Sequence, residues 1–184
     1  MNWSNSVRKE LTWVGTERAR VDTLQEQVAQ LFEESREDVY RYLLTLGLHP
    51  PQAQETVQEV FLRLYAELKK GEDIRNARAW VFRVAHNLGL KTRAKEGGVP
   101  FEAEMEASLA SPERNPEQDL LDRERTVRFH QAVQGLSEQQ RRCLSLRLEG
   151  LRYPEIGEVL GISASAVSEF LRRAIARLKK VGHE

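Results

Sequence analysis

Five polar side chains near the C-terminus are spaced so that one helix could present them to a nucleic acid. They are Ser165, Ser168, Glu169, Arg172 and Arg173. Arginine forms bidentate hydrogen bonds with guanine or binds phosphate, serine bonds to several base edges, and a carboxylate accepts from the N4 amino group of cytosine. The apolar residues of the same segment recur at helical spacing on the other side. The pattern therefore predicts a helix that buries one face and can enter a major groove with the other.

A shorter helix is predicted just before this one, so that the pair forms a helix-turn-helix. Pro154 suits a first helical position because its missing N–H costs nothing there, and apolar residues fall on one face up to Leu160. Gly161 is expected to end the helix in a left-handed conformation, and Ser163 to cap the next helix. A preceding helix is predicted to begin at a capping box formed by Ser137 and Gln140.

The helix-turn-helix pattern alone does not decide between two interpretations. Short helices joined by a tight turn also occur in all-α proteins that never bind DNA. On this motif, DNA readout and core packing are about equally supported.

The charge of the 184-residue chain is unevenly distributed. Its 28 basic and 28 acidic residues give a formal net charge of zero, although phosphate contacts usually supply much of the affinity of DNA-binding proteins. Acidic residues gather between residues 96 and 122, and basic residues gather on the predicted helices 77–95 and 164–180. Local fields matter more than the sum, so DNA binding stays compatible with neutrality.

Composition and periodicity predict an all-α protein of two small helical domains joined by an acidic linker. Good helix formers dominate, and β-branched runs bounded by turns are absent. We expect an N-terminal extension at 1–15, a helical domain at 16–96, a linker at 97–119 and the helix-turn-helix domain at 120–184. Within the first domain, residues 16–46 form either two helices or one bent helix.

Cysteine usage and hydropathy point to the cytoplasm. The single cysteine, Cys143, lies on the apolar side of a predicted helix, which indicates a buried structural thiol. No run of eighteen apolar residues and no secretion signal is present, so we expect a soluble chain without membrane insertion.

Three segments together resemble the extracytoplasmic-function sigma factors of the sigma-70 family. Glu-Thr-Val-Gln-Glu-Val-Phe, residues 55–61, is similar to that family's Asp-x-x-Gln-Glu-x-Phe helix. Residues 79–88 resemble the helix that follows it, and residues 150–163 resemble the family's minus-35 domain. The order and spacing of the segments and the acidic linker agree with the family as well.

The resemblance implies a dissociable subunit that binds core RNA polymerase, recognises promoter DNA and helps to open it. It assigns core-polymerase binding to Glu55, Gln58 and Glu59. It assigns minus-10 recognition, as single-stranded DNA, to the 68–76 loop and to Arg83, Asn87, Lys91 and Arg93. Minus-35 recognition goes to the five polar residues of the C-terminal helix, where Ser168-Glu169-Phe170 stands in place of a more basic or polar run.

The resemblance also implies what the chain lacks. Nucleotide addition belongs to the core enzyme, and the sequence shows no catalytic site, no metal-ligand spacing and no phosphate loop. We therefore expect no enzyme activity, no metal and no cofactor, and we expect an anti-sigma factor as a further partner.

Two other functions fit parts of the pattern. A two-domain transcriptional regulator can carry a similar helix-turn-helix domain, although its other half should show an α/β receiver or ligand-binding pattern, which is absent here. A sigma-like interaction module with weakened DNA recognition fits the neutral charge and Glu169.

Overall fold

Helices account for every regular element that the structure describes. The computed structural model describes the backbone of residues 3–96, 127–128 and 130–182, and no strand occurs in these ranges. This confirms the predicted all-α class. The predicted acidic linker, residues 97–119, lies outside the described residues, as do 120–126.

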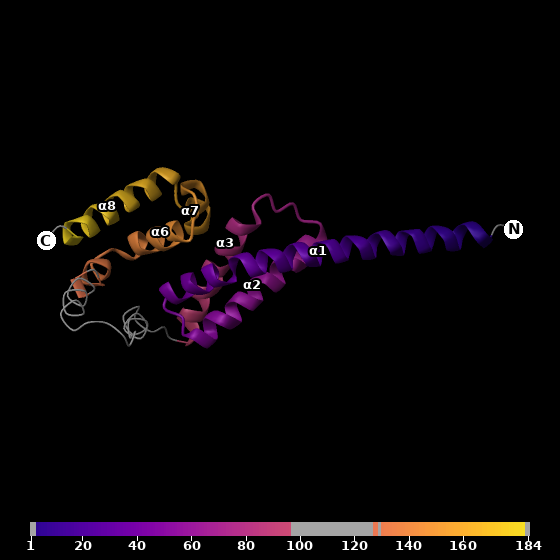
Figure 1. The fold of residues 1–184 in the computed structure, drawn as a ribbon, viewed down its shortest axis with the longest axis horizontal. Coiled ribbons are helices and arrows are strands. Elements are labelled where there is room, and N and C mark those ends of the chain that lie inside the picture. Colours follow the sequence, from indigo (N-terminus) through magenta and orange to yellow (C-terminus); the bar gives the residue numbers. More distant parts are fainter. Residues whose placement is uncertain (1–2, 97–126, 129, 183–184) are drawn as a thin grey trace, which may run out of the picture.

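The first helix, α1 (Trp3–Thr45), is a single long helix. The sequence predicted a helical pattern only from Thr16, as two helices or one bent helix. The N-terminal part of α1 extends well beyond the other helices, which pack against its C-terminal part (Figure 1). The helix ends at a turn in which Gly47 has a φ of 90° and Leu48 donates back to the Leu43 carbonyl.

Two further helices, α2 (Pro50–Lys70) and α3 (Ala77–Glu96), pack against α1 to form what we call the α1–α3 bundle. Pro50 and Pro51 occupy the first turn of α2, and Gly71 ends it with a φ of 92°. Asn76 caps α3, since its Oδ1 accepts from the Ala79 amide at 3.0 Å. The core of the bundle is built from fully or almost fully buried apolar side chains, chiefly Tyr42, Leu43, Phe61, Leu64, Val81 and Phe82.

The C-terminal helices form a second group, which we call the helix-turn-helix unit. It contains the helical residues 127–128 and 130–134, α6 (Glu138–Leu148), α7 (Tyr153–Leu160) and α8 (Ala164–Gly182). The predicted capping box at the start of α6 is present: Gln140 donates its amide to Ser137 Oγ at 3.2 Å, and the Ser137 amide donates to Gln140 Oε1 at 2.9 Å. Both predicted turn residues are confirmed, since Gly161 has a φ of 67° and Ser163 Oγ caps the Ala166 amide.

Gly157 brings α7 close to the turn that follows it. A Cβ at this position would lie 2.6 Å from the backbone oxygen of Ile162, so only glycine fits. On α8, Val167, Leu171 and Ala174 are buried and form the apolar side that the helical spacing predicted, whereas Ile175 is 42% exposed and lies at the edge of that side.

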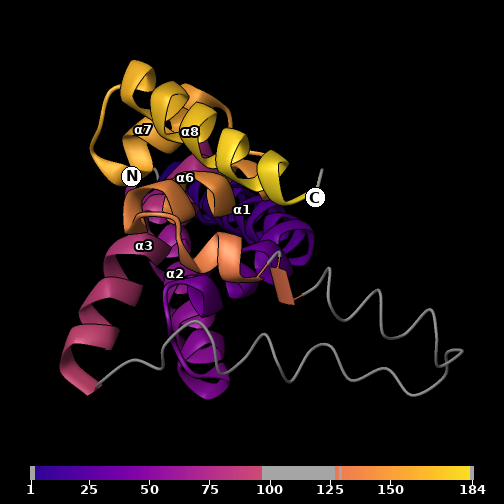
Figure 2. The same ribbon diagram turned by 90° about the vertical axis from the view of Figure 1, so that its left-hand side faces the viewer.

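The two helical groups are packed against each other. Contacts between α3 and α7 and between α1 and α6 join them, and Figure 2 shows α7 and α8 stacked on one side of α1, α2 and α3. Buried apolar residues form one cluster that reaches from Val39 of α1 to Leu171 of α8.

Candidate nucleic-acid interface

The five polar residues predicted to contact the minus-35 element lie on one side of α8. Ser165, Ser168, Arg172 and Arg173 are exposed, and the side chain of Glu169 is 41% exposed. The opposite side of the helix is held against α6 and α7 by the buried residues Val167, Leu171 and Ala174. The helix therefore presents an accessible polar face on a fixed support. Phe170 is half-buried and packs against the core.

Glu169 binds both arginines of this face. Its carboxylate accepts from Arg172 Nε and a terminal nitrogen at 2.9 and 2.8 Å, and from Arg173 Nε at 2.6 Å. These hydrogen bonds, first from Arg172 and then from Arg173, lower the pKa of Glu169 to about 2. Since the pairs are exposed, they contribute little to folding stability, but they fix the guanidinium groups in defined orientations.

The positions of Glu169, Arg172 and Arg173 in the sequence already predict that they form a charge cluster. The sequence analysis missed this signal. A carboxylate three and four residues before two arginines places all three groups on one helix face. The face therefore carries one net positive charge where two unpaired arginines would carry two.

Three of the four residues predicted to contact the minus-10 element lie together. Arg83, Asn87 and Lys91 are exposed on α3 and follow one another at intervals of four residues, which keeps them on one side of the helix. Arg93 lies on another side: it donates to the Leu46 carbonyl at 3.2 Å and approaches Glu138 of α6 at 3.4 Å.

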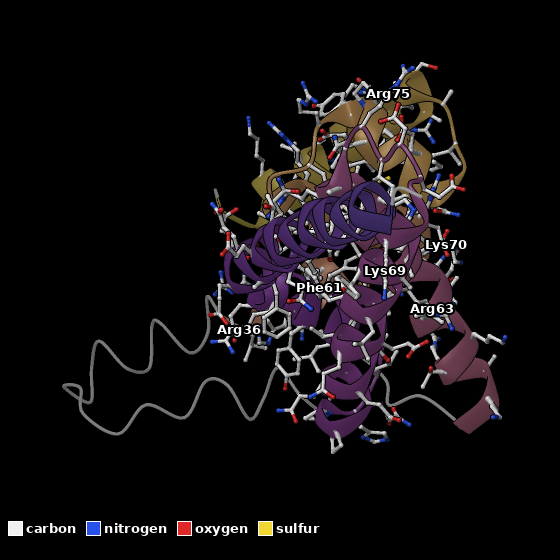
Figure 3. All side chains as sticks on the ribbon, turned by 90° about the vertical axis from the view of Figure 1, so that its right-hand side faces the viewer. Arg36, Phe61, Arg63, Lys69, Lys70 and Arg75 are labelled. Atoms are coloured by element: carbon white, nitrogen blue, oxygen red, sulfur yellow. The ribbon has the colours of Figure 1, made fainter. Side chains whose placement is uncertain are left out.

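A surface hollow of about 410 Å³ adjoins the start of α3. It is lined by the loop between α2 and α3, by Trp80 and Arg83 of α3, and by Glu158 of α7. Arg75 projects from the loop beside the helix-turn-helix unit (Figure 3). Phe82, by contrast, is fully buried and packs edge-on against Tyr42, so it belongs to the core.

The residues predicted to bind core polymerase share one face of α2. Glu55 and Gln58 are exposed and Glu59 is half-buried, and together they border a hollow of about 290 Å³. Glu59 accepts from Arg63 Nε at 2.6 Å. Figure 3 shows Arg63 on the side of α2 away from α1, while Phe61 lies on the side of α1, where its ring meets Phe32 edge-on at 5.1 Å.

Leu62 belongs to the same face and was missed by the sequence analysis. Its side chain is 65% exposed and borders both the polar hollow and an apolar groove between α1 and α2. The position of Leu62 in the sequence already indicated its exposure, because it falls outside the buried stripe of Val57, Val60, Phe61 and Leu64. A large apolar residue on the exposed side of a helix suggests a binding surface.

Two titratable groups are buried away from these surfaces. His86 Nδ1 lies 2.8 Å from the Tyr42 hydroxyl, and burial, together with Arg142, lowers the pKa of His86 to about 4. Burial raises the pKa of the Cys143 thiol to about 11, in agreement with the predicted structural role.

No group of three or more His, Cys, Asp or Glu residues in the described ranges could hold a metal ion. None of the described helices combines the length and apolarity that a bilayer crossing requires.

The chain matches two family models in the order that the sequence segments suggested. Residues 31–98 match sigma-70 region 2, and residues 126–178 match sigma-70 region 4. The first match covers α2, α3 and the end of α1, and the second covers the helix-turn-helix unit.

Similar proteins of comparable length are sigma factors. The RNA polymerase sigma factor YlaC of Bacillus subtilis is 25% identical over 158 residues, which cover 84% of this chain and 91% of YlaC. The ECF RNA polymerase sigma factor SigK of Mycolicibacterium vanbaalenii is 26% identical over 176 residues, which cover 88% and 89% of the two chains.

Solved structures share the fold. CnrH, in complex with the cytosolic domain of CnrY, gives a TM-score of 0.59 at 20% identity and covers 90% of this chain and 93% of its own. The sigma factor RpoE of Bartonella quintana, in complex with the anti-sigma factor NepR, gives 0.58 at 19% identity, with 85% and 96% covered. With both family models matched in sequence order, the chain belongs to the sigma-70 family and is a sigma factor of the extracytoplasmic-function group that initiates transcription.

Proposed function

We propose that this sigma factor divides its task between two units, with residues 16–96 binding core RNA polymerase and the minus-10 element and residues 120–184 binding the minus-35 element. Residues 97–119 link the two, and residues 1–15 extend the first. The observation that carries the proposal is the polar face of α8, whose five outward residues are supported by a buried apolar face. Nucleotide addition is left to the core enzyme, and the chain acts in the cytoplasm without a cofactor.

The α8 face is suited to a major groove. Ser165 and Ser168 lie toward the N-terminal end, where the helix dipole favours phosphate, and Arg172 and Arg173 follow one turn later. The guanidinium groups are oriented by Glu169, so each arrives at DNA in a defined plane. Guanine or phosphate can then replace Glu169 as the partner of an arginine.

The α3 face is suited to a single strand. Arg83 and Lys91 provide positive charge, and the side-chain amide of Asn87 lies between them along the helix. Trp80 is half-buried at the hollow that adjoins this face, where an aromatic ring can stack on an unpaired base.

The α2 face is suited to a protein partner. Two carboxylates, one amide and the exposed Leu62 form a surface with an apolar centre and an acidic border. A basic helical segment of core polymerase fits it, with Glu55 and Glu59 forming charge-assisted bonds. An anti-sigma factor, which is the partner in the solved RpoE complex, is proposed as a second protein that binds this chain.

The experiment separates the two surfaces with one variant each. Glu55→Lys should abolish co-purification with core polymerase and leave binding to duplex DNA unchanged. Arg173→Ala should weaken duplex binding, reduce the slope of log K against log[salt] by about 1, and leave core binding intact. Glu26→Lys on α1 and Arg36→Ala serve as matched controls for the two changes.

The outcomes distinguish the functions. An unchanged salt slope in Arg173→Ala contradicts a phosphate contact. If the wild-type chain binds duplex DNA but not core polymerase, the proposed sigma function is contradicted and a regulator that acts alone is favoured. If it binds core polymerase but not DNA, an interaction module is favoured.

A further inference from the structure

The exposed face of α8 carries a carboxylate and two guanidinium groups that are joined by hydrogen bonds. We propose that Glu169 and Arg173, which we call the C·G reader, together select one C·G base pair of the minus-35 element. Glu169 accepts from the N4 amino group of cytosine, and Arg173 donates to the paired guanine. The inference rests on the proposed minus-35 role of α8 and adds the base pair that this face selects.

Glu169 has one acceptor position left for a base. An ionised carboxylate offers about four such positions, two on each oxygen. Oε1 accepts from a terminal nitrogen of Arg172 at 2.8 Å and from Arg173 Nε at 2.6 Å, whereas Oε2 accepts from Arg172 Nε at 2.9 Å. Among the described residues, no second donor reaches Oε2. The side chain is 41% exposed, so the amino group of a base can approach this oxygen.

Arg173 keeps its terminal nitrogens for a base while it holds Glu169. A guanidinium group has five N–H donors, and the carboxylate uses the one on Nε. In the part of the chain that the structure describes, Nη1 and Nη2 bond to no other side chain, and the Arg173 side chain is 61% exposed. These two nitrogens form a fork that can bond to O6 and N7 of guanine. Arg173 can therefore read guanine without leaving Glu169.

Arg172 and the buried side of α8 hold the C·G reader in place. Arg172 donates to both oxygens of Glu169, which fixes the plane of the carboxylate. Leu171 and Ala174 of the same turn are buried and anchor the helix beneath the polar groups. The carboxylate is therefore oriented before DNA arrives, so binding costs little side-chain freedom.

A C·G pair matches this arrangement better than the other base pairs do. The N4 amino group of cytosine and O6 of guanine are hydrogen-bonded to each other, so a donor lies beside an acceptor in the major groove, as the carboxylate lies beside the guanidinium group. Guanine and thymine present acceptors, which repel a carboxylate. Adenine presents an amino group, but its partner thymine offers a single acceptor and a methyl group where guanine offers two acceptors. Glu169 thus selects against thymine and guanine at the cytosine position, and Arg173 selects against A·T.

Selection of promoter duplexes tests the C·G reader. The full-length chain, assembled with purified core RNA polymerase, is incubated with duplexes randomised over the minus-35 region, and the bound duplexes are sequenced. We expect the wild-type complex to enrich a C·G pair at one position. Glu169→Ala should lose this enrichment and keep the preferences at the other positions.

Two features make Glu169→Ala a clean change. Alanine suits a helix interior, and exposed ion pairs contribute little to folding, so α8 should stay intact. Glu37→Ala on α1 is the matched control, because it removes an exposed carboxylate away from the α8 face. The control should enrich the same duplexes as the wild type.

A base analogue separates direct readout from an indirect effect of Glu169 on the arginines. In the enriched duplex, the cytosine is replaced by 2-pyrimidinone, which lacks the N4 amino group and leaves the guanine in place. Competition binding should show that the wild-type complex loses affinity about tenfold, since a hydrogen bond to a charged group is removed. The Glu169→Ala complex has no acceptor to lose, so its affinity should change by no more than about twofold.

The C·G reader is supported if the loss of affinity caused by the analogue depends on Glu169. It is overturned if no C·G pair is enriched, or if Glu169→Ala enriches that pair as the wild type does. It is also overturned if the analogue weakens both complexes equally, since Glu169 then only orients the arginines. If the wild-type complex enriches no minus-35 sequence at all, the proposed minus-35 role of α8 fails, and the C·G reader fails with it.

Discussion

At the scale of single residues, Glu169 sets the net charge of the α8 face that we propose binds DNA. Because its pKa is about 2, the carboxylate is ionised near neutral pH, where it accepts hydrogen bonds from Arg172 and Arg173. A phosphate or guanine competes with this carboxylate for the Nε donors and for one terminal nitrogen of Arg172. In the proposed DNA-binding role, we therefore expect weaker contact with random DNA than two free arginines would give, which favours discrimination over bulk affinity.

Glu169→Gln should strengthen binding to random-sequence duplex DNA. The change removes one negative charge from the face and releases the arginines, so the slope of log K against log[salt] should steepen by about 1. Anisotropy titrations at several salt concentrations measure it, with Glu37→Gln on α1 as the control. An unchanged slope would show that the arginines are already free in solution.

At the scale of elements, the approach of α7 to its turn depends on Gly157. Glycine inside a helix normally costs stability relative to alanine. Here the Cβ of an alanine would lie 2.6 Å from a backbone oxygen of Ile162, which cannot turn away as a side chain can.

Gly157→Ala should therefore destabilise the chain, by about 1–3 kcal/mol in the free energy of unfolding. Urea titration monitored by circular dichroism measures the loss. Gly89→Ala of α3 is the matched change, because its Cβ would meet the flexible ends of Leu43 and Leu46, and its loss should be smaller. Equal stability of Gly157→Ala and wild type would contradict the close approach.

The elements that local chemistry defines were predictable from the sequence. The Ser137 capping box, the left-handed Gly161 and the Ser163 cap each depend on residues within a few positions, and all three are present. The start of α1 at Trp3 was not predicted, because residues 3–15 carry no regular apolar period. Arg93 bonds to the Leu46 carbonyl just after α1, a contact across 47 positions that no local pattern reveals.

At the scale of the whole molecule, His86 reports on the packing of the two helical groups. It is buried against Tyr42, and Arg142 of α6 contributes to lowering its pKa to about 4. The unfolded chain binds a proton near pH 6.5, whereas the folded chain does so only near pH 4. Stability is therefore full above pH 6.5 and is lost as the pH falls toward 4.

Lowering the pH from 7.5 to 5 should reduce the free energy of unfolding by about 2 kcal/mol through His86. Urea titrations at both pH values measure the difference in the free energy of unfolding. In His86→Gln the contribution of about 2 kcal/mol from His86 should be absent. NMR titration of the His86 ring should give a pKa well below that of an exposed histidine, because the ring is buried and lies near Arg142. A pH dependence of stability that is the same in His86→Gln as in wild type would contradict the buried, neutral ring.

The docking of the two groups could not be read from the sequence. Asn76 and Glu155 are separated by 79 positions, and neither stands in a motif that names its partner. The polar face of α8 and the acidic face of α2 were predictable, since each is a single amphipathic helix with its polar side outward.

The central claim is that this chain, as a sigma factor, selects promoters through the polar face of α8. Run-off transcription with purified core RNA polymerase and a randomised promoter library tests it most directly. We predict transcripts only in the presence of the chain, from templates that share a minus-35 and a minus-10 sequence. With Arg173→Ala, enrichment at the minus-35 positions should weaken while the minus-10 preference remains. Transcripts without sequence preference, or none at all, would contradict the account.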